Sequence, residues 1–253
     1  TASLDTAKWT SKNARKIGEA PVIFSPELVD ASCTQLKRAM NNKGYFRAIV
    51  DTTMQVKDRK VNLAYHITTN EPYSIRNYSI SLDNSELSSV AQNQRYTLVH
   101  NGMQFDADIL NQERQRVAST MRRRGYFYFD QEMLQYKADS TRGKQQIDVK
   151  MELQDYIQML SDEEKENIFR VYKIARVHFH IDYDPTRLPE DKEMYASSRD
   201  GYVFTWVGKQ LLREKMLIRN CPIKPGDRYN ENFVERTYAR LNQLAPIKYV
   251  DIS

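Results

Sequence analysis

The chain has 253 residues, of which 40% are hydrophobic and 28% are charged, with only 8 glycines and 8 prolines. This composition is typical of a folded globular chain and excludes a low-complexity or disordered one. No run approaches the roughly 18 apolar residues of a membrane helix. The net charge of +5 comes from 38 basic residues interspersed with 33 acidic ones, so we expect no nucleic-acid partner.

The first predicted domain covers residues 1–70 and has the order helix, helix, strand, strand. Residues 5–17 follow a helical pattern, and residues 26–43 form a second helix that begins with a proline. Apolar and polar residues then alternate over 46–56 and again over 61–67, which predicts two strands. No strand precedes the first helix, so this domain is expected to lack its front strand.

The second predicted domain, residues 71–155, is the most complete. Its elements come in the order strand, helix, helix, strand, strand, at residues 73–82, 85–96, 107–124, 127–136 and 147–153. Asp106 is the expected N-cap of the second helix. A single stripe of that helix carries Leu110, Val117, Ala118 and Met121, which we expect to face the core.

Residues 156–170 are predicted to be a linker with a short helix, which begins with a capping box of Ser161 and Glu164. The third predicted domain, residues 171–253, starts with a strand and then has a polar insertion at 184–200. Its remaining predicted elements are two helices, at 210–219 and 231–244, and a strand at 246–252. The second strand of that closing pair is expected to be missing.

A repeated phrase connects these domains. Gly44-Tyr45-Phe46 and Gly125-Tyr126-Phe127 each close a helical pattern and open an alternating one. A weaker copy lies at residues 241–248, and Tyr172-Lys173-Ile174 resembles Tyr73-Ser74-Ile75. Such internal repeats predict a row of small domains rather than one large core. Rows of this kind hold and guide other chains.

The strand, helix, helix, strand, strand order, with a turn such as Pro225-Gly226-Asp227-Arg228-Tyr229 before the second helix, resembles POTRA domains. Residues 15–24 and 41–46 further resemble BamA-like proteins of Bacteroidetes, which are related to the translocation and assembly module. In the third copy, Ala245-Pro246-Ile247 replaces the Gly-Tyr-Phe phrase. The resemblance implies an α+β fold of tandem POTRA domains, each a three-stranded sheet covered by two helices.

The resemblance also implies a function. POTRA domains of this kind form the periplasmic region of outer-membrane β-barrel assembly or translocation proteins, so the parent would be membrane-embedded through a C-terminal barrel. The implied partners are unfolded outer-membrane protein precursors or periplasmic assembly proteins. The alternatives are a two-partner secretion translocator, or a structural docking module that binds a folded partner through helix faces.

An edge strand offers unpaired backbone groups to an incoming strand. In POTRA-like folds the strand after the second helix is the usual candidate. Its outward positions would be Arg47, Ile49 and Asp51 in the first domain and Tyr128, Asp130 and Glu132 in the second. The alternative is that these are ordinary solvated strand residues.

Neither catalysis nor a cofactor is expected. The sequence lacks a glycine-rich phosphate loop, a nucleophile elbow and a supported Ser/His/Asp order. His178, His180 and Asp182 share one face of a strand, but two histidines need a third ligand from elsewhere to hold a metal. We therefore expect these histidines to face water and expect no metal site.

Overall fold

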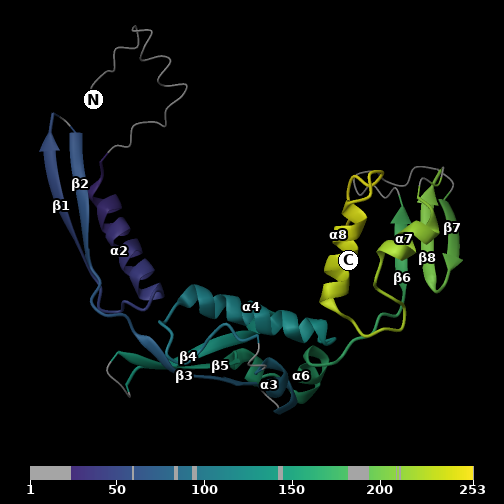
Figure 1. The fold of residues 1–253 in the computed structure, drawn as a ribbon, viewed down its shortest axis with the longest axis horizontal. Helices are drawn as coiled ribbons and strands as arrows, with labels where there is room; N and C mark the ends of the chain where they lie inside the picture. Colours follow the sequence, from purple (N-terminus) through teal and green to yellow (C-terminus); the bar gives the residue numbers. More distant parts are fainter. Residues whose placement is uncertain are drawn as a thin grey trace, which may run out of the picture. The chain divides into compact units, whose positions relative to one another are not determined.

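The computed structural model describes residues 24–58, 60–82, 85–92, 96–141, 145–181, 194–208, 210 and 212–252. The chain forms two compact units, residues 1–73 and residues 74–253, which we call unit 1 and unit 2 (Figure 1). Unit 2 contains two of the predicted repeats, here named the middle repeat (residues 74–155) and the third repeat (residues 171–252). The predicted helix at 5–17 lies outside the described residues.

In unit 1, helix α2 (Pro26–Asn42) is followed by strands β1 (Ile49–Lys57) and β2 (Lys60–Thr68). The two strands pair antiparallel, and their register sets Val50 opposite Ile67 and Met54 opposite Leu63. The apolar positions of both strands therefore share one face, as the alternation in the sequence predicts.

The middle repeat begins with strand β3 (Ser74–Ser81) and helices α3 (Ser85–Ala91) and α4 (Ala107–Arg123). A short 3₁₀ turn, η1 (Gln131–Met133), leads into β4 (Leu134–Asp139) and β5 (Gln146–Leu153). The sheet order is β3-β5-β4, with β3 parallel and β4 antiparallel to the central β5. The α4 helix lies along one face of this sheet (Figure 1). The predicted α+β fold and element order are confirmed here.

Helix α4 is held against the sheet by the stripe that the sequence predicts. Leu110, Val117, Ala118 and Met121 are all buried. The Asp106 side chain accepts a hydrogen bond from the backbone N–H of Asp108 at 2.9 Å, and so caps the helix. Burial of the apolar stripe is the main favourable term that docks such a helix.

The third repeat follows two short helices, α5 (Asp155–Gln158) and α6 (Asp162–Ile168), the second of which starts with the predicted Ser161–Glu164 capping box. In chain order, the third repeat consists of β6 (Val177–Ile181), β7 (Met194–Arg199), β8 (Tyr202–Val207), α7 (Glu214–Asn220) and α8 (Glu231–Asn242). Leu217 and Leu241 of the two helices pack with the buried Phe204 of β8 to form the core.

The strand hairpin of the third repeat precedes the helices rather than following them. The sheet order β6-β8-β7 has the same parallel and antiparallel pairing as β3-β5-β4. The hairpin turns at Asp200 and Gly201, whose φ angles are 53° and 82°, as a tight hairpin turn with two left-handed residues requires.

Three sequence expectations for unit 2 are corrected by this arrangement. The segment 184–200 is not only a polar insertion, because strand β7 lies within it, and the sequence prediction missed β8 altogether. Residues 246–252 do not form a strand, and the place beside β6 is already taken by β8. The predicted helices at 85–96 and 210–219 are shorter, and the structure has Ser85–Ala91 and Glu214–Asn220 instead.

The Gly-Tyr-Phe copies share one backbone structure. Gly44 and Gly125 have φ angles of 84° and 98°, a left-handed conformation that glycine adopts at helix ends without a Cβ penalty. The next residue donates its N–H back to the helix in both copies, Tyr45 to Met40 at 3.0 Å and Tyr126 to Met121 at 3.2 Å. These two copies therefore end their helices with the same glycine conformation and the same backbone hydrogen bond.

Glu113 of α4 is fully buried and organises one side of the middle repeat. Its carboxylate accepts hydrogen bonds from the Arg116 guanidinium at 2.7 and 2.9 Å and from the Leu98 N–H at 3.0 Å. The hydroxyl of Tyr78 also donates to it at 3.3 Å, and burial raises the pKa of Tyr78 far above its ordinary value, so this hydroxyl stays protonated. Arg116 donates further to the Ala91 carbonyl at 2.9 Å. The network thus ties α4 to α3, to β3 and to the loop between the helices.

We predict that Glu113→Gln lowers the free energy of unfolding by about 3 kcal/mol, because it leaves the poorly exposed Arg116 guanidinium without a counter-charge. Urea denaturation of the two proteins measures the difference. Glu163→Gln, at an exposed position of α6, is the control and should change stability by less than about 0.5 kcal/mol. Equal losses in both variants would contradict the role of this network.

A second carboxylate fixes the hairpin of the third repeat to α7. Glu214 accepts a hydrogen bond from the Ser197 hydroxyl at 2.5 Å and from Arg199 Nε at 2.6 Å. These two donors, Ser197 first, hold the pKa of Glu214 below its ordinary value of 4.5. The ionised form therefore stabilises the folded state.

The stabilisation by Glu214 should depend on pH. A carboxyl group with a lowered folded pKa contributes stability above its unfolded pKa, and the contribution is lost as the pH falls through the folded pKa. We predict that Glu214→Gln is less stable than the parent at about pH 7 and that the two converge toward about pH 4 and below. Urea denaturation across this range measures the gap. A gap that stays constant with pH would show that ionisation of Glu214 does not stabilise the fold.

Candidate interaction edges and the joint between repeats

The predicted edge residues of the first repeat fall partly on a strand. Ile49 and Asp51 lie in β1, where they pair with Thr68 and His66, on the face opposite to the apolar one. Arg47 lies in the turn before the strand, and its carbonyl accepts a hydrogen bond from the side-chain amide of Asn70 at 3.0 Å. All three predicted residues are exposed. The predicted strand from residue 46 is therefore wrong in its first three positions.

The predicted edge residues of the middle repeat do not lie on a strand. Tyr128 is in a turn, and the Asp130 side chain accepts a hydrogen bond from the N–H of Glu132 at 2.8 Å. This bond caps the 3₁₀ turn η1, so the strand cannot start before Leu134. The prediction that residues 127–136 form one strand is wrong for its first seven residues.

The sheets do leave open edges within the described parts of the chain. In the middle repeat β5 is central, so β3 and β4 each have one side without a neighbouring strand. In the third repeat β8 is central, and the outer strands are β6 and β7. In unit 1 the described sheet consists of β1 and β2 alone.

The outer face beside β4 carries paired charges. The Lys137 ammonium contacts Glu152 and lies 3.6 Å from Asp155, and Lys150 lies 3.1 Å from Glu152. Burial alone would raise the pKa of Glu152, but hydrogen bonds from the two lysines bring it below its ordinary value. A hollow of about 250 Å³ on this face is lined by Asn77, Ser79, Lys137, Ala138, Asp139, Asp148, Val149 and Lys150. The lysine and carboxylate charges on this face therefore compensate each other.

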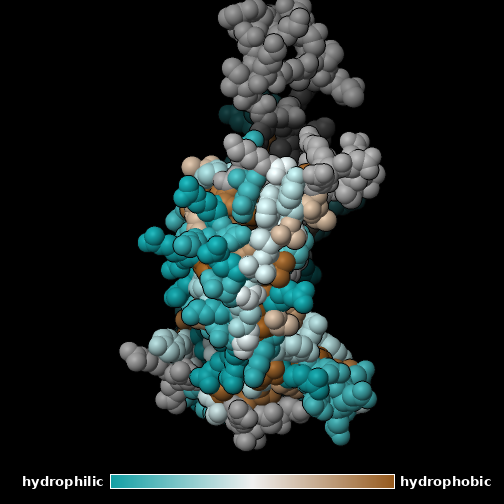
Figure 2. All heavy atoms as spheres, turned by 90° about the vertical axis from the view of Figure 1, so that its right-hand side faces the viewer, coloured by the Kyte–Doolittle hydropathy of each residue, from teal (hydrophilic) through white to brown (hydrophobic). Residues whose placement is uncertain are grey.

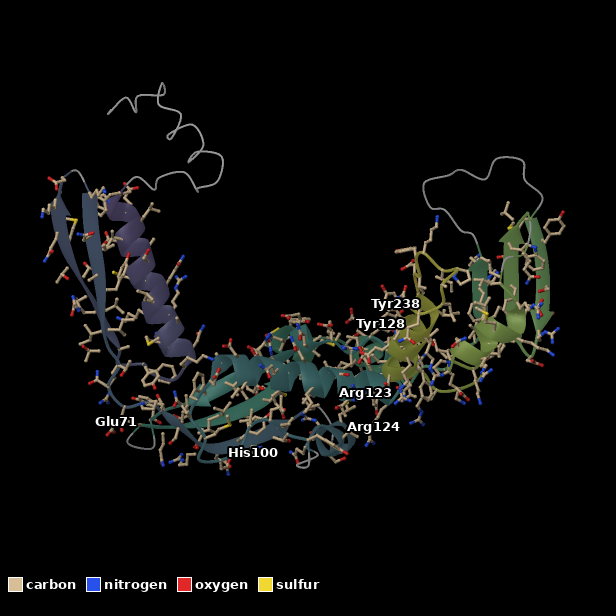
Figure 3. All side chains as sticks on the ribbon, turned by 45° about the horizontal axis from the view of Figure 1, so that its top comes forward. Glu71, His100, Arg123, Arg124, Tyr128 and Tyr238 are labelled. Atoms are coloured by element: carbon tan, nitrogen blue, oxygen red, sulfur yellow. The ribbon has the colours of Figure 1, made fainter. Side chains whose placement is uncertain are left out.

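A joint connects the middle and third repeats within unit 2. The N–H of Tyr172 donates to the carbonyl of Gly125 at 2.9 Å. The Phe127 ring meets Tyr229 edge to face at a centroid distance of 4.8 Å, and Tyr128 meets Tyr172 at 5.3 Å. Figure 3 labels Tyr128 at this joint. Tyr128 therefore packs in the joint, and Gly125 accepts the backbone hydrogen bond that connects the two repeats.

An ion pair spans the same joint. Arg122, in the last turn of α4, donates from Nε to Glu231 at 2.5 Å, and the Ser119 hydroxyl donates to the same carboxylate at 2.7 Å. Glu231 is the first residue of α8. Each charge also interacts favourably with its own helix dipole, a cation at a C-terminus and an anion at an N-terminus. Arg123 and Arg124, also labelled in Figure 3, are exposed at the end of α4.

The two histidines of the third repeat lie together on β6. His178 and His180 are exposed, and their ring centroids are 3.7 Å apart. Asp182, the third residue of the predicted face, lies outside the described residues. Within the described ranges, no group of three or more His, Cys, Asp or Glu side chains is arranged to hold a metal ion.

Sequence reasoning missed the residues that hold the joint and the hairpin. Val171 and Arg228, which lie close to Gly125, and Glu231, which binds Arg122, gave no periodic signal, because their partners are distant in the sequence. The hairpin had a local signal in Asp200-Gly201, a dipeptide that favours a two-residue hairpin turn, followed by alternating Tyr202, Phe204 and Trp206. In the described part of the chain, no helix combines the length and apolar character needed to cross a membrane.

In sequence, the chain matches no protein-family model and no curated protein. In structure, it is similar to POTRA3-5 of BamA from Haemophilus influenzae, with 13% identity and a TM-score of 0.48 over 98% of this chain and 84% of that chain. It is also similar to the N-terminal domain of Omp85 from Thermosynechococcus elongatus, with 13% identity and a TM-score of 0.26 over 96% and 83% of the two chains. For BamA from Haemophilus ducreyi lacking POTRA domains 1-3, the identity is 15%, the TM-score 0.35 and the coverage 54% of this chain and 24% of that one.

We predict that Gly125→Ala loosens the joint. A Cβ atom there would lie 2.7 Å from Val171 Cγ1 and 2.8 Å from Arg228 Cγ. Gly102→Ala is the matched control, because Gly102 has a similar φ of +87° but nothing within 4 Å of the added atom. The control should lose about 1–2 kcal/mol of unfolding free energy through the backbone alone, and Gly125→Ala should lose more.

Urea denaturation measures both glycine variants, and amide chemical shifts of residues 171–173 and 228–229 report on the joint itself. We expect these shifts to change in Gly125→Ala and to stay unchanged in Gly102→Ala. The same loss in both variants, with an undisturbed joint, would show that the close approach at Gly125 is unimportant.

Proposed function

We propose that this chain is the POTRA-type region of an outer-membrane assembly or translocation protein of the BamA or translocation-module type. It would work in the periplasm, without catalysis, by binding extended segments of other chains through its sheet edges. The observation that carries the proposal is the repeated small sheet with helices on one face and a free outer strand. The sequence resemblance of the repeats to POTRA domains supports the same function.

The chemistry of the edges supports binding through the backbone. The outer strands β1, β4 and β7 contain no proline, so each non-bonded N–H can donate to an added strand. Natural proteins block edges with charges, bulges or covering segments. The pairing register of β7 is continuous, and its single charged residue is Arg199. Such an edge can pair with many sequences, because the backbone supplies the affinity.

The proposed binding residues follow the observed strands. In unit 1, Ile49 and Asp51 remain candidates on β1, and Arg47 precedes them. In the middle repeat the proposed edge is β4, with Gln135 and Lys137 on its outer face. Tyr128, Asp130 and Glu132 would flank this edge instead of forming it.

The proposed substrates are unfolded outer-membrane protein precursors, or extended segments of periplasmic assembly partners. A two-partner secretion translocator would use the same edges for one dedicated substrate. A docking module would bind a folded partner through its helix faces and would not respond to extended peptides. The experiment below separates the docking module from edge binding.

We predict that a peptide of about ten residues with alternating apolar and polar side chains, the pattern of a barrel strand, protects amides of the free edges from hydrogen exchange. Protection should appear at every second residue of β1, β4 or β7, because alternate N–H groups of an edge strand point away from the sheet. Amide exchange followed by NMR on the intact chain measures this pattern.

A control peptide with proline at alternate positions cannot complete the backbone ladder and should bind far more weakly. Protection confined to helix amides, or equal binding of both peptides, would contradict edge binding and would favour the docking module.

A further inference from the structure

The outer face of the third sheet differs from that of the middle sheet. His178 and His180 on β6 pair in register with Val203 and Thr205 on β8. Ala196 of β7 pairs with Thr205. His178 and His180 are exposed on this face, and their imidazoles can bind a metal ion.

Both imidazoles are directed at the same hydroxyl. His178 Nε2 lies 3.1 Å from Thr205 Oγ1, and His180 Nδ1 lies 2.9 Å from the same atom. A hydroxyl has one hydrogen to donate, so one imidazole nitrogen accepts it and the other donates its own N–H to the oxygen. The sheet thus brings two ring nitrogens from one strand to a common point.

The two imidazoles lie close enough together to bind one ion. In a metal complex each imidazole nitrogen lies about 2.0–2.1 Å from the ion, and here His178 Nε2 and His180 Nδ1 lie 3.1 Å and 2.9 Å from one atom, Thr205 Oγ1. The ring centroids of His178 and His180 are 3.7 Å apart, on adjacent same-side positions of one strand. Side-chain rotation alone can bring the two nitrogens onto one ion, because both residues are exposed.

We propose that His178 and His180 form a binding site for one divalent transition-metal ion of the class that prefers imidazole nitrogen, such as Zn²⁺ or Cu²⁺. The Thr205 hydroxyl lies beside the ion as an oxygen contact. Water fills the remaining coordination positions, which face solvent. With two protein nitrogens the affinity is modest and depends on both histidines together.

The chain supplies its own control. His66 of β2 also contacts a threonine hydroxyl, since its Nε2 lies 2.9 Å from Thr53 Oγ1. This pair reproduces the imidazole–threonine contact on a strand but has only one imidazole. If chelation by two histidines creates the site, His66 should contribute nothing to it.

The test is a titration of the intact 253-residue chain with ZnCl₂, followed by calorimetry and by amide chemical shifts. We expect one ion per chain and shifts confined to residues 177–181 and 203–206. His178→Ala and His180→Ala should each weaken zinc binding by about 100-fold, because a chelate becomes a single contact. His66→Ala should leave zinc binding unchanged.

One further result keeps the test decisive. Melting temperatures without zinc should be the same for the parent and the histidine variants, because both side chains are exposed. Unchanged zinc binding in the double variant His178→Ala/His180→Ala would overturn the proposal. The absence of localised shifts in the parent at about millimolar zinc would overturn it as well, because even modest sites fill at that concentration.

Discussion

One backbone hydrogen bond sets the geometry on which the repeat depends. A tyrosine N–H donates to the carbonyl of a helix-ending glycine, from Tyr73 to Gly44 and from Tyr172 to Gly125, at 2.9 Å in both cases. The glycine serves two purposes, since its left-handed φ turns the chain out of the helix and its missing side chain allows close approach. At Gly125 the approach is by Val171 and Arg228. In the third repeat Ile174, two residues after Tyr172, then donates its N–H to the carbonyl of Asp227 at 2.8 Å. Within unit 2, the end of α4, the segment before β6 and the turn before α8 therefore meet at one point.

The features that the sequence predicted well are local. Helix caps such as Asp106 and Ser161, the buried stripe of α4 and the alternation in β1 and β2 depend on neighbours within a few residues. The sequence could not predict which strand takes which place in a sheet. Residues 246–252 have an acceptable strand pattern, yet β8 lies beside β6, because sheet pairing is decided between segments that are remote in sequence. The start of β4 was misplaced for a local reason, since the Asp130 cap favours a 3₁₀ turn over an extended chain.

The candidate site residues also divide into those that local sequence patterns predict and those that only contacts between remote segments determine. Alternation predicts Ile49 and Asp51 on the outer side of β1, and in the observed register they lie on the face opposite to Val50 and Met54. Tyr128 was expected on an edge but packs against Tyr172 in the joint, a contact that only the arrangement of two repeats creates. Thr205 could not have been connected with the histidines from the sequence, because the parallel pairing of β6 and β8 joins them. The pair Arg122 and Glu231 likewise spans two helices that belong to different repeats.

The same sheet arrangement built from two chain orders bears on the proposed edge binding. In the middle repeat the outer strand of the hairpin, β4, follows the second helix, and in the third repeat the corresponding strand, β7, precedes both helices. The two edges therefore present different side chains: Lys137 is held by carboxylates beside β4, while Met194 and Tyr195 of β7 are 71% and 44% exposed. What the edges share is an outer strand with no second described strand beside it. The proposed backbone pairing tolerates differences in side chains, whereas a function based on one constellation of side chains would not survive the change of chain order. The apolar side chains on β7 would then bias this edge toward apolar partners, and the charges near β4 would bias that edge toward polar ones.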